Sequence, residues 1–149
     1  MRCTQNLVLI LNDKDVNKVM KQSILFLCPH HAAKSVLAEA YFNHAMAGKG
    51  FEAVSGGTEP DDAVMPSVAD LLKNEGIDVS GHRPRRVTAE ELAAAFRMIS
   101  MGCTAEELNT APNRIEMWLD IPPARQNVIA ARDAILAHIE HLMRELNGQ

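Results

Sequence analysis

Short apolar segments that favour strands alternate with segments of helical periodicity along most of this chain, and this alternation constrains its fold more than any other feature. Residues 23–27 are apolar, Cys28 and Pro29 interrupt them, and a helical pattern starts near Ser35. Further strands are expected at residues 52–55, 97–101 and 115–119, and further helices around residues 68–72, from residue 89 onward and at residues 128–146. The alternation predicts an α/β fold, a single three-layer domain with a mainly parallel sheet of about four strands between helices.

The ends of the expected helices carry capping signals. Gly48 and Gly76 lie where the first two helical patterns stop, and Thr88 with Glu91 forms a capping-box pattern that opens the next helix. Parallel sheets of this class bind ligands at the carboxyl ends of their strands. Because Cys28 follows the first strand, its loop is the first candidate for a functional site.

Chain length and charge restrict the domain count and the partners. With 149 residues, of which 47% are hydrophobic, the chain should form one core, which we assign to residues 23–149, with residues 1–22 as an N-terminal extension. The longest apolar runs have five residues, far too few to span a membrane. A net charge of −4 gives no general attraction to nucleic acid or to a membrane surface, so an anionic partner has to be bound locally.

Features near the N-terminus and the cysteine pattern bear on location. The apolar run at residues 7–11 is short and is followed by Asp13 and Asp15, which is unlike a secretion signal. Three cysteines at wide, irregular spacing form neither a disulfide framework nor a zinc pattern. We therefore expect a cytoplasmic protein.

The segment Cys-Pro-His-His-Ala-Ala-Lys-Ser at residues 28–35 combines a thiol at a strand end with a cation at a helix start. Backbone N–H groups at a helix start, the helix dipole and the Lys34 ammonium all favour negative charge, on a bound oxyanion or on the sulfur itself. A Cys28 thiolate would be a nucleophile, and the Ser35 hydroxyl could donate a hydrogen bond to it. Spacing alone leaves open the alternative that Cys28 is a small buried hydrophobe.

Five short segments carry a family resemblance. They are residues 24–40, the Ser-Gly-Gly-Thr at 55–58, the Gly-Ile-Asp-Val-Ser at 76–80, the Met-Gly-Cys at 101–103, and the Trp-Leu-Asp-Ile-Pro-Pro at 118–123. In this order they resemble the low-molecular-weight protein tyrosine phosphatase superfamily, and within it the arsenate reductase branch that shares the fold. The resemblance covers residue 23 to about residue 142. It implies that Cys28 is the nucleophile, that Lys34 takes the place of the loop arginine, and that Ser35 supports the thiolate.

The phosphate-binding loop departs from the family pattern Cys-x-Gly-Asn-x-x-Arg-Ser. By the resemblance, the oxyanion-binding loop consists of His30, His31, Ala32, Ala33, Lys34 and Ser35. His30 and His31 replace the glycine and the asparagine, and Pro29 brings no N–H to the loop. Lys34 keeps the positive charge of arginine but loses its planar bidentate fork. These changes favour retained anion binding over retained catalysis.

Two further positions are assigned by the resemblance. The family protonates the leaving group with an aspartate directly before a proline, and Asp120, two residues ahead of Pro122, is the nearest match. A loop acid without a catalytic role is the alternative for Asp120. Cys103 matches the second cysteine of the arsenate reductases and is a candidate redox partner for Cys28, although no third cysteine follows it. Burial at a strand end is the alternative for Cys103.

The remaining candidate residues have simpler interpretations. The adjacent His30 and His31 are too few for a structural metal site, so we expect no metal and assign them to the pocket lining, where an imidazole could donate to an anion. The other candidates, which we interpret as solvated surface groups or, for the histidines, a partner-facing pair, are Arg83, Arg85, Arg86, His138 and His141.

Two functional hypotheses result. The first is a cysteine-dependent enzyme, a phosphatase or arsenate reductase, in which Cys28 attacks a phosphoryl or arsenate group, with no cofactor and with a thiol reductant in the reductase case. Its partner is a phosphate-like oxyanion or a phosphorylated substrate. The second is a catalytically degenerate relative that binds an oxyanion or a phosphoprotein as a regulatory module. The sequence favours no particular oligomeric state.

Overall fold

A four-stranded parallel sheet forms the centre of the computed structural model, which describes residues 21–148. The strands are β1 (Gln22–Leu27), β2 (Phe51–Gly56), β3 (Arg97–Ser100) and β4 (Ile115–Met117), in the order β2-β1-β3-β4. The helices are α3 (Lys34–Ala45), α4 (Pro66–Asn74), α5 (Ala89–Ala94) and α6 (Val128–Asn147), with a 3₁₀ turn η1 (Pro112–Arg114). The predicted α/β fold with a parallel sheet is confirmed. Cys3 and most of the predicted N-terminal extension lie outside the described residues.

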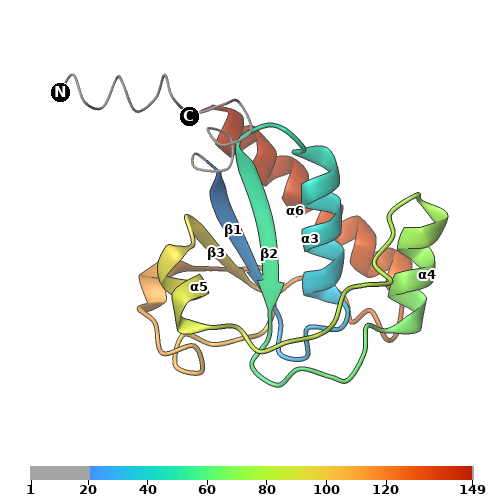
Figure 1. The fold of residues 1–149 in the computed structure, drawn as a ribbon, viewed down its shortest axis with the longest axis horizontal. Coiled ribbons are helices and arrows are strands. Elements are labelled where there is room, and N and C mark those ends of the chain that lie inside the picture. Colours follow the sequence, from blue (N-terminus) through green and yellow to red (C-terminus); the bar gives the residue numbers. More distant parts are fainter. Residues whose placement is uncertain (1–20, 149) are drawn as a thin grey trace.

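The sheet separates two hydrophobic clusters (Figure 1). Along β1, Ile24 and Phe26 pack in the larger cluster with α3 and α6, whereas Leu25 and Leu27 pack in the smaller cluster beside α5. Successive side chains of a strand point to opposite faces, so a central strand covered on both faces is apolar throughout. This is why residues 24–27 form an unbroken apolar run.

Local signals fix several helix ends where they were expected. The Thr88 side chain accepts a hydrogen bond from the Glu91 backbone, and the Glu91 carboxylate accepts one from the Thr88 backbone, which completes the capping box of α5. Gly76, with φ +83°, follows the end of α4 in a conformation that favours glycine. None of the helices in residues 21–148 is long and apolar enough to cross a lipid bilayer.

Two glycines let neighbouring loops approach the segment that follows β1. A Cβ atom on Gly57 would lie 2.5 Å from the Pro29 carbonyl oxygen, and one on Gly102 would lie 3.0 Å from Pro29 Cδ. The loops after β2 and β3 therefore pack directly against the loop after β1, at the carboxyl edge of the sheet.

Candidate active site

Cys28 lines a pocket of about 510 Å³ at this edge of the sheet. Residues from four loops line it: Cys28, Pro29, His30, Ala32, Ala33 and Lys34 after β1; Asp61 and Met65 after β2; Met101 and Gly102 after β3; and residues 123–126 before α6. The position follows from topology, because the carboxyl ends of parallel strands converge and their loops enclose the space above them.

The Cys28 thiol has one close polar partner. Cys28 Sγ lies 3.0 Å from Ser35 Oγ, in the first turn of α3, and both residues are buried. When the sulfur is ionised, the hydroxyl is the only possible donor of the two, so it stabilises a thiolate. The geometry brings together the thiol and hydroxyl that sequence analysis paired.

The backbone of the Cys28 loop is held from outside by the loop after β2. The carbonyl oxygens of Pro29, His30 and Ala32 accept hydrogen bonds from the backbone N–H groups of Glu59, Asp61 and Met65, at 2.7, 2.9 and 2.9 Å. All peptide bonds are trans in the described chain, and the N–H that follows a trans carbonyl points the opposite way. Several loop N–H groups therefore point away from the β2 loop, and no side chain caps the start of α3.

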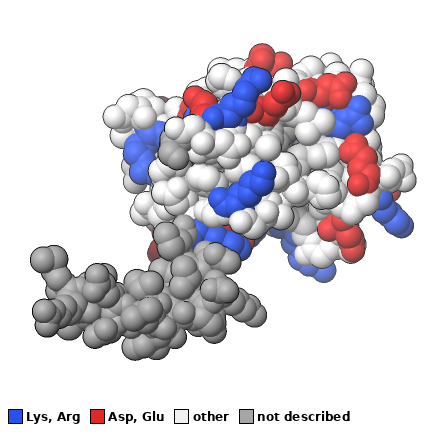
Figure 2. All heavy atoms as spheres, turned by 90° about the horizontal axis from the view of Figure 1, so that it is seen from above, with Lys and Arg blue, Asp and Glu red and all other residues white. Residues whose placement is uncertain are grey.

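Two cations line the pocket. Lys34 begins α3, and Arg125 belongs to the loop before α6. Neither side chain forms an ion pair with any residue in the range 21–148. On the face drawn in Figure 2, basic and acidic side chains are interspersed and form no continuous basic surface. The whole chain has a net charge of −4, so the attraction of an anion depends on charges close to the site.

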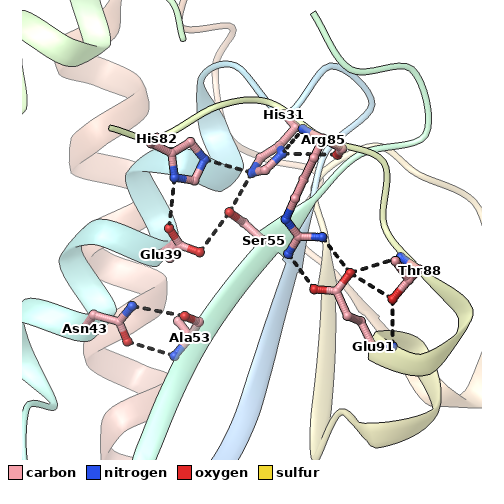
Figure 3. Close-up of polar contacts among 9 residues, drawn as sticks. All are labelled: His31, Glu39, Asn43, Ala53, Ser55, His82, Arg85, Thr88 and Glu91. Carbon is pink, nitrogen blue, oxygen red and sulfur yellow. Dashed lines mark hydrogen bonds and ion pairs between the residues drawn. The ribbon is translucent and has the colours of Figure 1, made fainter. Parts of the chain in front are cut away.

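Behind the loop, His31 is the centre of a buried polar network (Figure 3). Its Nε2 lies 2.7 Å from Ser55 Oγ and 3.0 Å from His82 Nε2, and Ser55 Oγ donates to Glu39 Oε1 at 3.0 Å. His82 Nδ1 lies 3.4 Å from Glu39 Oε2, which closes a ring of four side chains. His31 therefore connects the loop to β2, α3 and the segment before α5.

The hydrogen bonds define the protonation of His31. Its Nδ1 lies 2.9 Å from the Arg85 backbone nitrogen and 3.2 Å from the Arg85 carbonyl oxygen. The shorter contact is the one in which the Arg85 N–H donates to Nδ1, and in that arrangement the neutral ring keeps its proton on Nε2. The Nε2 proton is donated in a hydrogen bond to Ser55 Oγ, and the Ser55 hydroxyl in turn donates a hydrogen bond to Glu39. Burial, followed by the nearby His82, lowers the pKa of His31 to about 4. The network thus requires a neutral His31.

This placement corrects the expectation that His31 lines the pocket. His31 is fully buried and is absent from the pocket wall, whereas His30 is part of that wall. Within the loop of residues 28–35, His31 has a positive φ, of +50°. The left-handed backbone turns the His31 ring toward Ser55 and His82, so its imidazole cannot donate to an anion in the pocket.

Comparisons with known proteins agree with this geometry. Residues 23–118 match the family described as low molecular weight phosphotyrosine protein phosphatase. The chain belongs to this family. A protein of Halobacterium salinarum named "Putative arsenate reductase" is 30% identical over 129 residues, which cover 82% of this chain and 91% of that protein.

Solved structures of the family share the fold. A thioredoxin-dependent arsenate reductase of Corynebacterium glutamicum superposes with a TM-score of 0.72 at 27% identity, over 85% of this chain and 62% of that one. The low molecular weight protein tyrosine phosphatase of T. tengcongensis gives a TM-score of 0.73 at 22% identity, over 84% of this chain and 99% of that one. The resemblance read from the five segments is therefore confirmed at the level of fold and family.

Asp120, the expected general acid of the family, lies elsewhere. Its Oδ1 is 2.7 Å from His138 Nε2, its side chain is 71% exposed, and it is not among the pocket residues. His138 belongs to α6 and also stacks on Trp118, with ring centroids 4.5 Å apart, so Asp120 and Trp118 both contact this helix. The His138 hydrogen bond lowers the pKa of Asp120, which favours the form that cannot donate a proton. The structure does not bring Asp120 to Cys28, and His138 is not the free surface group that sequence analysis expected.

Cys103, the candidate redox partner, is fully buried in the cluster beside α5, with Leu25 and Leu27. Cys28 packs in the cluster on the α3 and α6 face. Burial raises the pKa of the Cys103 thiol, and its one polar side-chain neighbour is Thr58 Oγ1 at 3.7 Å. The two thiols therefore pack in different hydrophobic clusters and Cys103 does not line the pocket, although Cys28 is near enough to contribute to the raised pKa of Cys103.

Sequence analysis did not single out five residues of this region: Asp61 and Arg125 in the pocket, and Glu39, Ser55 and His82 in the network, to which the backbone of Arg85 also belongs. Ser55 lies within a matched motif, and Glu39 is one helical turn after Ser35, which are signals that could have been followed. Arg85 was interpreted as solvated, yet its side chain pairs with Glu91. No local pattern identifies Asp61 or Arg125.

Proposed function

We propose that this protein is a cysteine-dependent phosphatase that hydrolyses phosphate monoesters in the Cys28 pocket. The observation that carries the proposal is the 3.0 Å contact between the Cys28 thiol and the Ser35 hydroxyl at the start of α3. The pocket that Cys28 lines is also lined by two cationic side chains, Lys34 and Arg125. The thiolate attacks phosphorus, an S–P bond forms, and the ester oxygen leaves. Water then attacks the phosphoryl group, and inorganic phosphate and the thiolate are released.

Three groups would stabilise the charge that develops on the phosphoryl oxygens. The loop N–H groups and the start of α3 supply donors, and Lys34 supplies the charge in the loop position that the family fills with arginine. Arg125 faces the same pocket from the opposite loop and adds a guanidinium, which can form the bidentate contacts that Lys34 cannot. Lys34 and Arg125 together support the enzyme hypothesis over the degenerate binding module, because Arg125 offsets the loss of the arginine that the family has in its loop.

We expect Lys34→Ala to lower kcat/KM for an aryl phosphate by about 10²-fold, because a preorganised cation at the developing charge is lost. Lys34→Arg should keep or raise the activity, and Arg125→Ala should lower kcat/KM in the same direction as Lys34→Ala. The matched controls are Lys73→Ala on α4 and Arg144→Ala on α6, both outside the pocket. Steady-state kinetics with these variants test the proposal; equal effects of Lys34→Ala and Lys73→Ala would contradict it.

Arsenate reduction is a second candidate, favoured by the name of the Halobacterium salinarum relative. In this reaction Cys28 sulfur binds arsenic, an external thiol attacks that sulfur, and arsenite leaves as arsenic gains two electrons and a mixed disulfide forms. An external thiol takes this role because Cys103 is fully buried and does not line the pocket. The reductant could be a small thiol or a dithiol protein.

We expect arsenate without an external thiol to produce no disulfide between Cys28 and Cys103. With an external thiol, arsenite release should be the same in Cys103→Ser as in the unchanged protein. Mass spectrometry of non-reduced peptides and an arsenite assay measure the two outcomes. A disulfide between Cys28 and Cys103 would show that the sheet edge opens during turnover and would restore the intramolecular relay.

A further inference from the structure

Asp120, the expected proton donor, does not line the pocket, but two other side chains of the kinds that act as general acids do. Ester cleavage leaves a negative oxygen, and a general acid that protonates it speeds the step by about 10²–10⁴-fold. Asp120 is bound to His138 outside the pocket. Among the residues that line the pocket, His30 is the only histidine and Asp61 the only carboxylic acid. These are the side-chain types that most often act as general acids.

His30 and Asp61 are held against each other by side-chain and backbone contacts. His30 Nδ1 lies 3.1 Å from the Glu59 carbonyl oxygen and 3.4 Å from Asp61 Oδ1. Because both neighbours are acceptors, Nδ1 carries a proton and donates it. The Asp61 N–H donates to the His30 carbonyl at 2.9 Å, which fixes the two residues as a unit.

This arrangement leaves the other ring nitrogen of His30 available. His30 Nε2 makes no hydrogen bond to any residue of the described chain, and the His30 side chain is 56% exposed at the pocket wall. In the doubly protonated ring, Nε2 also carries a proton. A ring fixed through Nδ1 and free at Nε2 is suited to exchange a proton with a ligand in the pocket.

We propose that His30 is the general acid and base of this site, oriented by Asp61; the inference rests on the phosphatase function proposed above. As the S–P bond forms and the P–O bond breaks, Nε2 gives its proton to the leaving oxygen. In the second step the neutral Nε2 takes a proton from the attacking water, as the S–P bond breaks and phosphate is released. Asp61 is a positioning residue that holds the imidazole through Nδ1.

Leaving-group dependence tests this role. A poor leaving group such as phenol needs the proton, whereas dinitrophenol leaves readily as an anion. We expect His30→Asn to lower kcat/KM for phenyl phosphate by about 10²-fold or more and for dinitrophenyl phosphate by less than about threefold. Asp61→Asn should show the same selectivity with a smaller loss. A merely structural role would affect both substrates alike.

Matched controls are His141→Asn on α6 and Asp120→Asn, which should change neither substrate's kinetics. The rate of Cys28 alkylation by iodoacetate should be unchanged in His30→Asn, which verifies that the loop is intact. Equal losses on both substrates, no loss, or a selective loss in Asp120→Asn would overturn the assignment while leaving Cys28-dependent turnover in place. If no aryl phosphate is hydrolysed in a Cys28-dependent way, the phosphatase function itself fails, and this assignment with it.

Discussion

Cys28→Ser is expected to abolish aryl phosphate hydrolysis, with a loss of at least ~10³-fold in kcat. The serine hydroxyl would occupy the same place beside Ser35 but is a far weaker nucleophile than a thiolate. Phosphate release measured for the purified variant tests this expectation. Binding of inorganic phosphate should survive the substitution, because the loop N–H groups, Lys34 and Arg125 remain.

The matched control for this result is Cys103→Ser. Cys103 is buried beside Leu25 and Leu27, away from the pocket, so its substitution should leave kcat within about twofold of the unchanged protein, once both proteins are shown to be folded. Turnover that persists in Cys28→Ser would remove the proposed nucleophile. Phosphate binding without turnover in the unchanged protein would instead support the degenerate binding module.

The second large effect is a loss of stability in acid that originates at His31. The folded protein holds the pKa of His31 at about 4, against 6.5 for an ordinary histidine. Between these values the unfolded chain binds a proton that the folded chain refuses, so stability is complete above about pH 6.5 and falls as the pH decreases toward 4. The difference corresponds to about 3 kcal/mol.

The physical cause is first the burial of His31 within the hydrogen-bond ring shown in Figure 3 and then the nearby His82, both of which disfavour a positive charge on the ring. A second proton on His31 would be placed on Nδ1, where the Arg85 carbonyl oxygen at 3.2 Å offsets only part of this effect. Burial raises the pKa of Glu39, so its titration favours the folded state as the pH falls and opposes part of the effect. Glu39 is present in every variant compared.

Urea unfolding from pH 7 to pH 4 measures the effect, with His31→Asn as the comparison. Asparagine tolerates the left-handed backbone at φ +50° and does not titrate, so the stability of His31→Asn should fall less with acid, by an amount that approaches about 3 kcal/mol. The measured quantity is the change in the free energy of unfolding with pH, and not its value at pH 7. Parallel curves for the two proteins would show that His31 titrates normally and that the ring does not depend on its neutral form.

Most of the fold could be predicted from sequence because its signals are local. The apolar run of β1, the Thr88 capping box and Gly76 each act within a few residues, and the expected strands and helices agree with the structure to within one or two residues at most ends. The Cys28 and Ser35 contact also follows from a short loop between a strand and a helix.

The rest of the site depends on contacts between distant segments. His31 meets Ser55, His82 and Arg85 across 24, 51 and 54 residues, and these pairings exist only once the sheet has formed. Asp120 lies outside the pocket because its carboxylate is bound to His138 of α6, on which Trp118 also stacks. The loop that contains Asp120 also brings Arg125, which no motif marks, to the pocket.

The central claim is that the Cys28 sulfur becomes covalently bound to phosphorus during turnover. A rapid denaturing quench during hydrolysis of an aryl phosphate, followed by peptide mass spectrometry, measures this directly. We predict a phosphoryl group on the peptide that contains Cys28, present also in Cys103→Ser and absent in Cys28→Ser. Turnover without any phosphoryl group on Cys28 would contradict the claim.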